Sequence, residues 1–342
     1  CGAERQALEP TPPATRTRLT VILTRTVWFL SEGGGAGFAV FVEVEGCVQV
    51  ARLETDRRWV ESLEGGPSCR DCPERFSLAA GSGLFVHQPP APVEGPARLR
   101  FGSLSCSTLS ATFLDGETPP DRLRVWSRAL PSPAASASIE LEFRHGPFSS
   151  SAPPHETARL LNQVQSLMAP SALSVTVTKS EDDPNLPTRL EWFEGAPAAL
   201  EALVPEATGE VEVVFAGCIE RVFPAVGSRT TLDGLVPRIP TFGARGGGVF
   251  LRGRECFGAS TDPIPWPTEV LARRLAHELG HFLGLYHSRE ASGLEDRLPD
   301  TGDDTLMLPN PSLAPEAVFS PLQAERMRRH ARIVAEGLPP AR

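Results

Sequence analysis

The sequence predicts a multi-domain α+β chain in which an all-β sandwich precedes an α/β domain. Residues 18–130 contain short segments rich in β-branched and aromatic residues, separated by Pro/Gly clusters and without a helical period. From residue 139 to residue 342, strand patterns alternate with helical ones. A Pro/Ser-rich stretch at residues 131–138 lies between the two regions, and we interpret it as a linker.

The length and composition suit two folded domains. The chain has 342 residues, of which 41% are hydrophobic and 22% charged, so it can bury a core and does not resemble a disordered protein. The net charge of -9 argues against a nucleic-acid partner. No apolar run reaches the roughly 18–20 residues that a membrane span requires, and we expect a monomer.

The chain begins with Cys1, and residues 1–17 are interpreted as a flexible stalk because they contain several prolines. An initial cysteine is typical of bacterial lipoproteins, in which a signal peptide has been removed and the cysteine carries a lipid. We therefore expect an exported protein of a bacterial cell envelope, or one released from it, whose only membrane contact is this lipid. The alternative is a chain boundary that happens to fall at this cysteine.

The six remaining cysteines form an even set, which in an exported chain predicts three disulfide bonds. Cys218 and Cys256 are the two in the second half of the chain, and we expect them to bond to each other. The pairing among the other four stays open, and these are Cys47, Cys69, Cys72 and Cys106. The C-x-x-C spacing of Cys69 and Cys72 could indicate a redox or metal site, but a structural disulfide is the favoured interpretation.

The strands expected in the N-terminal domain are Leu19–Leu30, Phe38–Glu45, Ala97–Leu104, Thr108–Phe113 and Leu123–Ala129. Nothing in this domain has the pattern of a catalytic site, and His87 is interpreted as a surface residue. The domain's role in targeting, binding or latency stays open.

The C-terminal domain begins with an expected strand at Ile139–Arg144. The elements expected after it are a helix at His155–Met168, strands at Leu173–Thr178 and Glu210–Ile219, a helix from about Thr268, and a last helix ending near Glu336. Residues 246–251 are predicted to form either an edge strand beside a cleft or a loop before a buried strand. Thr268 is the expected N-cap of the helix that begins there, and Ser320 with Gln323 forms an expected capping box at the start of the last helix.

The pattern H-E-x-x-H-x-x-G-x-x-H occurs at residues 277–287. Residues four apart share one face of a helix, so His277 and His281 can direct their imidazoles at one point. Gly284 can leave the helix with a positive φ, and the chain can then return so that His287 becomes a third ligand. This predicts one catalytic zinc ion, with a fourth position left open for water and with Glu278 close to that water.

The motif followed by Met307 resembles the metzincin clan of zinc endopeptidases, which have the same pattern and a downstream methionine turn. Residues 136–342 carry the resemblance, and their tail resembles exported lipoprotein metalloproteases of myxobacteria-like bacteria. The resemblance implies a twisted sheet, an active-site helix and a C-terminal helix. It also implies that Met307 packs beneath the metal without ligating it, and that Glu278 is the general base and acid.

We therefore expect a zinc-dependent endopeptidase that hydrolyses extracellular or envelope proteins. One alternative is a surface binding protein with a vestigial zinc site, and another is a zinc hydrolase acting on a non-protein amide.

Latency through Cys69 or Cys72 reaching the zinc is disfavoured, because a disulfide removes the free thiolate. A calcium site is an alternative at the acidic residues of the loop after the motif, but a solvated loop is preferred. These acidic residues are Asp296, Asp300, Asp303 and Asp304.

Overall fold

The structure is a computed structural model, and it describes two parts of the chain. In the N-terminal part it describes nine strands, which lie within residues 18–129. In the C-terminal part it describes residues 135–147, 154–193, 200, 203–204, 210–223, 228–236, 248–253, 266–285, 287–289, 298, 300–302, 304–310 and 316–336.

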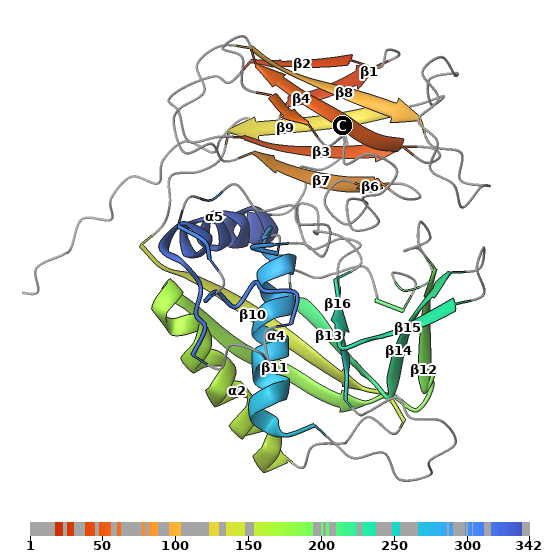
Figure 1. The fold of residues 1–342 in the computed structure, drawn as a ribbon, viewed down its shortest axis with the longest axis vertical. Helices are drawn as coiled ribbons and strands as arrows, with labels where there is room; N and C mark the ends of the chain where they lie inside the picture. Colours follow the sequence, from red (N-terminus) through yellow and green to blue (C-terminus); the bar gives the residue numbers. More distant parts are fainter. Residues whose placement is uncertain are drawn as a thin grey trace, which may run out of the picture.

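The N-terminal strands pair in two sheets (Figure 1). They are β1 (Arg18–Ile22), β2 (Thr26–Leu30), β3 (Phe38–Val44), β4 (Val48–Thr55), β5 (Val60–Ser62), β6 (Ser77–Leu78), β7 (Ser82–His87), β8 (Pro96–Ser103) and β9 (Leu123–Ala129). One sheet has the order β1-β9-β3-β7, and the other has the order β2-β8-β4-β5 with β6 beside β4. All pairings in both sheets are antiparallel. The face-to-face packing of a sandwich stays a prediction, and the expected strand Thr108–Phe113 lies outside the described residues.

The C-terminal part alternates strands and helices, which confirms the α/β architecture predicted for it. Its first elements are β10 (Ala137–His145), α2 (Pro154–Met168), a 3₁₀ turn (Ala169–Ser171), β11 (Leu173–Asp182), β12 (Arg189–Phe193) and β13 (Val211–Ala216). The later elements are β14 (Cys218–Phe223), β15 (Ser228–Leu232), β16 (Gly234–Leu235), β17 (Gly248–Arg252), α4 (Thr268–Phe282) and α5 (Pro321–Glu336). Two predicted boundaries are wrong: β10 begins inside the predicted linker, and Gly217 divides the single strand expected over residues 210–219.

A five-stranded sheet in the order β11-β10-β13-β17-β16 carries the zinc-motif helix. Its first four strands are parallel, and β16 is antiparallel to β17. Of the two alternatives for residues 246–251, the edge strand is wrong and the buried strand is right, because β17 is buried along its whole length between β13 and β16. Among the described strands, the edge on this side of the sheet is β16, a two-residue strand from earlier in the chain. A separate sheet has the order β12-β14-β15.

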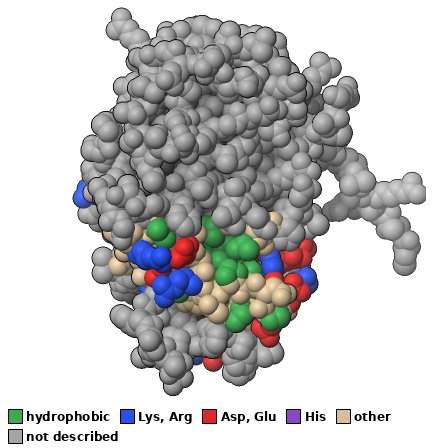
Figure 2. Space-filling view, turned by 90° about the vertical axis from the view of Figure 1, so that its right-hand side faces the viewer, with side chains coloured by type: hydrophobic (Ala, Val, Ile, Leu, Met, Phe, Trp, Pro, Cys, Tyr) green, Lys and Arg blue, Asp and Glu red, His purple; other side chains and the backbone are tan. Residues whose placement is uncertain are grey.

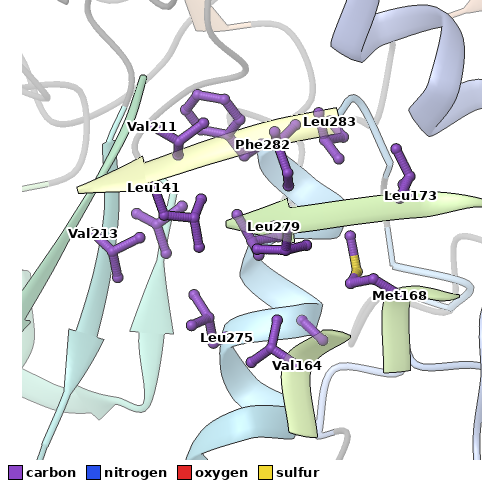
Figure 3. Packing of buried hydrophobic residues seen from close by; sticks show 14 of the residues in the cluster. Leu141, Val164, Met168, Leu173, Val211, Val213, Leu275, Leu279, Phe282 and Leu283 are labelled. Atoms are coloured by element: carbon purple, nitrogen blue, oxygen red, sulfur yellow. The ribbon is translucent and has the colours of Figure 1, made fainter. Parts of the chain in front are cut away.

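The core of this part lies between the sheet and two helices. Helices α2 and α4 contact each other, and they also contact β11 and β17 respectively (Figure 1). Leu275, Leu279 and Phe282 on α4 are fully buried, and Figure 3 shows them among residues of the sheet and of α2. The spacing of leucine and phenylalanine along α4 therefore buries one face of this helix, and this packing fixes the position of His277 and His281 on it.

The two C-terminal helices begin in different ways. Thr268 was expected to cap α4, but Pro267 occupies the N-cap position and makes no side-chain cap hydrogen bond. The capping box of α5 is confirmed: the Ser320 amide donates to Gln323 Oε1 at 3.0 Å, and the Gln323 amide donates to Ser320 Oγ at 3.2 Å. Among the described residues, no helix is long and apolar enough to cross a membrane.

Candidate metal centre

Helix α4 and the turn after it position the three motif histidines. His277 and His281 lie one turn apart on the helix, which ends at Phe282. Gly284 then adopts φ +88°, a left-handed conformation that favours glycine. The Gly284 amide donates to the His281 carbonyl at 2.9 Å, and the Leu285 amide donates to the Gly280 carbonyl at 2.9 Å. This C-terminal turn redirects the chain so that His287 returns to the helix, as the sequence predicted.

The three imidazoles converge on one point. His281 Nε2 lies 3.1 Å from His277 Nε2 and 3.1 Å from His287 Nε2. One nitrogen from each ring lies within 4.8 Å of the other two. A tetrahedral zinc ion with bonds of about 2.05 Å requires neighbouring nitrogens about 3.3 Å apart, so the observed spacing fits such an ion.

Hydrogen bonds on the far side of two rings favour the tautomer in which the converging nitrogens carry lone pairs. His277 Nδ1 lies 2.6 Å from the Leu306 carbonyl oxygen, and His281 Nδ1 lies 2.9 Å from the Leu285 carbonyl oxygen. A carbonyl only accepts, so each Nδ1 is assigned the proton and each Nε2 is left unprotonated. Two lone pairs about 3 Å apart repel each other unless a cation lies between them. The donor set therefore fits a metal ion.

The electrostatics of the cluster favour the neutral form of His277. His277 is 4% exposed. Burial lowers the pKa of His277 well below its usual value, and the neighbouring His281 and His287 lower it further. Because metal ions bind the neutral imidazole, this environment favours metal binding over protonation.

The turn that contains Met307 lies directly beneath the helix. Met307 is fully buried, and a Cβ added at Gly280 would lie 2.5 Å from Met307 Sδ. The Ser288 amide donates to the Met307 carbonyl at 2.8 Å. The turn therefore contacts both sides of the site. The Leu306 carbonyl accepts a hydrogen bond from the His277 ring, and the Met307 carbonyl accepts one from the amide of Ser288, which follows His287. Met307 packs against Gly280 in this arrangement, and its role beneath the metal stays a prediction.

Glu278, the expected general base, lies against the edge strand. Its side chain is 7% exposed, and a Cβ added at Gly234 would lie 2.7 Å from Glu278 Cδ and would overlap its Oε1. The carboxylate therefore occupies the space that any side chain at position 234 would need. Sequence reasoning missed Gly234, because a single glycine 44 residues before Glu278 has no local signal that connects the two.

The other predicted site residues are only partly described. Cys218 is disulfide-bonded, while its expected partner Cys256 lies outside the described residues, as do the other predicted disulfide cysteines and Cys1.

Among the acidic residues considered for calcium, Asp300 accepts hydrogen bonds at the start of α5, from Ser320 Oγ at 3.0 Å and from the Leu322 amide at 2.8 Å. Asp300 thus acts as a second cap of α5, a role that the sequence analysis did not predict.

The helix, the left-handed turn, the three histidines and the buried methionine turn have the arrangement of a metzincin-type metallopeptidase site. The prediction of this arrangement from the motif is confirmed by the geometry of the chain itself.

Comparisons with known proteins find solved structures that are similar to part of this chain, and these include the two that follow. An archaemetzincin from Methanopyrus kandleri has a TM-score of 0.35 and 16% identity, covering 58% of this chain and 98% of that one. Metalloproteinase-II from Bacteroides fragilis has a TM-score of 0.34 and 13% identity, covering 58% of this chain and 55% of that one. No protein-family model and no curated protein matches the sequence. TM-scores below 0.5 do not establish a shared fold, so the functional conclusion depends on the site.

Proposed function

We propose that the protein is a zinc-dependent endopeptidase of a bacterial cell envelope or its surroundings. The observation that carries this proposal is the convergence of three imidazoles, two from helix α4 with Nε2 atoms 3.1 Å apart and one from the turn after it, beside a buried carboxylate of the same helix. Three protein ligands leave a fourth position for water or substrate, which distinguishes a catalytic zinc site from a structural one.

In the proposed reaction, His277, His281 and His287 hold the metal. A zinc ion held there supplies Lewis-acid activation of a water molecule and of the peptide carbonyl. Glu278 accepts the proton from the attacking water and donates it to the leaving amine. The Leu306 and Leu285 carbonyls fix the ring orientation of two ligands, and Gly234 leaves room for the Glu278 carboxylate.

The edge strand supports a peptide over a smaller amide as substrate. Among the described strands, β16 is the last of its sheet, and a Cβ added at its Gly234 would overlap the Glu278 carboxylate. An extended peptide can add to a free strand edge through main-chain hydrogen bonds. A peptide paired with β16 would therefore have its backbone close to Glu278.

Two further observations bear on the setting. The disulfide at Cys218 supports an oxidising compartment, in keeping with an exported protein. Figure 2 shows hydrophobic, basic and acidic side chains mixed over the described part of one face. That part of the surface is not uniformly basic, and it therefore does not favour a polyanionic partner.

The test is digestion of casein or gelatin by the zinc-loaded protein, with Glu278→Gln as the matched variant. Because glutamine keeps the size of the side chain but cannot accept the proton, we expect zinc to bind as in wild type and cleavage to fall at least about 100-fold. A chelator should abolish cleavage, and added zinc should restore it. Full cleavage by Glu278→Gln would contradict the mechanism, and hydrolysis of small amides alone would contradict the substrate class.

A further inference from the structure

Two arginines from different elements meet the carboxylate of Asp233, which joins β15 to β16. Arg252, at the end of β17, and Arg274, on α4, each bind a separate oxygen of this carboxylate. Arg274 Nη2 lies 2.6 Å from Asp233 Oδ2. The Arg252 amide also donates to the Asp233 carbonyl at 3.0 Å. Asp233 therefore connects β15, β17 and the motif helix at one point.

The aromatic ring of Trp266 completes this cluster. The guanidinium of Arg274 lies 3.6 Å from the centroid of the Trp266 ring, and that of Arg252 lies 5.0 Å from it. Trp266 precedes α4, and the guanidinium of Arg274 contacts both this ring and the Asp233 carboxylate. An arginine held in this way has few alternative conformations, because both stacking and the ion pair restrict it.

The cluster adjoins the proposed general base. Asp233 directly precedes Gly234, whose Cα borders the Glu278 carboxylate, and Arg274 lies one helical turn before Glu278 on α4. The link between Asp233 and Arg274 thus joins the strand that borders the carboxylate to the helix that carries it. A shift of β16 away from α4 would open the space beside Glu278.

This cluster has features that a purely stabilising contact does not require. Arg274 is 5% exposed, and burial lowers its pKa although Asp233 opposes that effect. Among the described residues, Arg274 Nη1, Arg252 Nε and Trp266 Nε1 are buried without a hydrogen-bond partner. Buried ion pairs are weak evidence for stability, since apolar side chains of similar volume often stabilise as much. A role in holding β16 in position against α4 explains why Asp233, Arg252 and Arg274 are charged rather than apolar.

We propose that Arg274 is a positioning residue, whose ion pair with Asp233 holds edge strand β16 against the motif helix so that Gly234 confines the Glu278 carboxylate. In this proposal Arg274 positions Glu278 through Asp233 and β16, in addition to the attraction between its own charge and the Glu278 carboxylate. The kinetic consequence rests on the proposed peptidase function, whereas the structural link between α4 and β16 does not.

The experiment compares Arg274→Met, Asp233→Asn and the double variant in the full-length, zinc-loaded protein. The matched control is Arg159→Met. Arg159 lies on α2 and forms an exposed ion pair with Glu269 of α4, the helix that also carries Arg274. The measurements are kcat and KM on a casein-derived peptide, zinc affinity by chelator competition, and hydrogen–deuterium exchange over residues 228–236.

We expect each single variant to lower kcat about 10–100-fold, as for residues that orient a catalytic group, with KM and zinc affinity within about threefold of wild type. Exchange at β16 should rise in both. The double variant should lose no more than the larger single loss, because both substitutions break the same link. Arg274→Lys should retain part of kcat, since it keeps the charge but loses the planar guanidinium.

The proposal is overturned if Arg274→Met keeps kcat within about twofold of wild type or loses no more than Arg159→Met. A loss of zinc affinity that parallels the loss of kcat overturns it as well, because the residue would then support the metal ligands. If Arg274→Met does not fold, Asp233→Asn decides by the same criteria. If wild type cleaves no peptide, the proposed function fails, and exchange at β16 then decides the link: a rise supports it, and unchanged exchange overturns it.

Discussion

His330 on α5 provides a pH test of the packing behind the metal centre. Its side chain is fully buried, and its Nδ1 lies 3.1 Å from the position that a Cβ on Gly284 would occupy. Neither ring nitrogen has a hydrogen-bond partner among the described residues. Burial lowers the pKa of His330 to about 3, and the charge of Arg326 contributes to this shift.

The sign of the effect follows from proton binding. In the unfolded chain, His330 binds a proton below a pKa of about 6.5, whereas in the folded protein it does so only below about 3. Stability from this residue is therefore complete above pH 6.5 and is lost as the pH falls from 6.5 to 3. The full displacement of about 3.5 pH units corresponds to about 5 kcal/mol, of which about 2 kcal/mol is lost between pH 7 and pH 5.

The assay is urea unfolding of wild type and His330→Leu at pH 7 and pH 5. Leucine fills a similar volume and does not titrate, so the variant should lose about 2 kcal/mol less than wild type between the two values. Protonation of the metal ligands contributes equally to both proteins and cancels in the difference. An equal loss of stability in wild type and variant would refute the assignment of a buried neutral histidine.

The remaining predictions concern glycines and the metal. Gly234→Ala should lower kcat at least about 10-fold without loss of zinc, because the added methyl group displaces the Glu278 carboxylate; kinetics and metal analysis check this. Gly280→Ala should lower the free energy of unfolding by about 1–3 kcal/mol through overlap with Met307 Sδ, whereas Gly302→Ala, at an exposed position, should have little effect; urea unfolding distinguishes them. Chelation should lower the melting temperature of wild type in calorimetry, since zinc binds the folded site. An unchanged melting temperature would argue against a bound metal.

Local features of the C-terminal part were predictable from the sequence. Helix α4 and the left-handed turn at Gly284 depend on residues within a few positions of each other, and so does the Ser320–Gln323 capping box. Backbone geometry alone brings positions i and i+4 to one helix face, so His277 and His281 could be paired before any tertiary contact was known.

Contacts between distant segments were not predictable. For residues 246–251 the sequence left an edge strand and a loop before a buried strand as alternatives, and the structure buries β17 and places β16 beyond it. The pairing of two short apolar strands carries no signal in their local period, because a buried strand and an edge strand of this length have similar patterns. Asp300 likewise caps a helix that begins 21 residues later in the chain.

The sequence by itself determined the ligand set, since the spacing of the motif histidines is a property of one helix and one turn. Tertiary structure decided what surrounds them: Leu306 orients His277, Gly234 makes room for Glu278, and Asp233 ties β16 to α4. The physical reason is the range of the interactions. Helical periodicity repeats every few residues and is encoded locally, whereas a carbonyl or carboxylate from a distant segment arrives only when the core has packed.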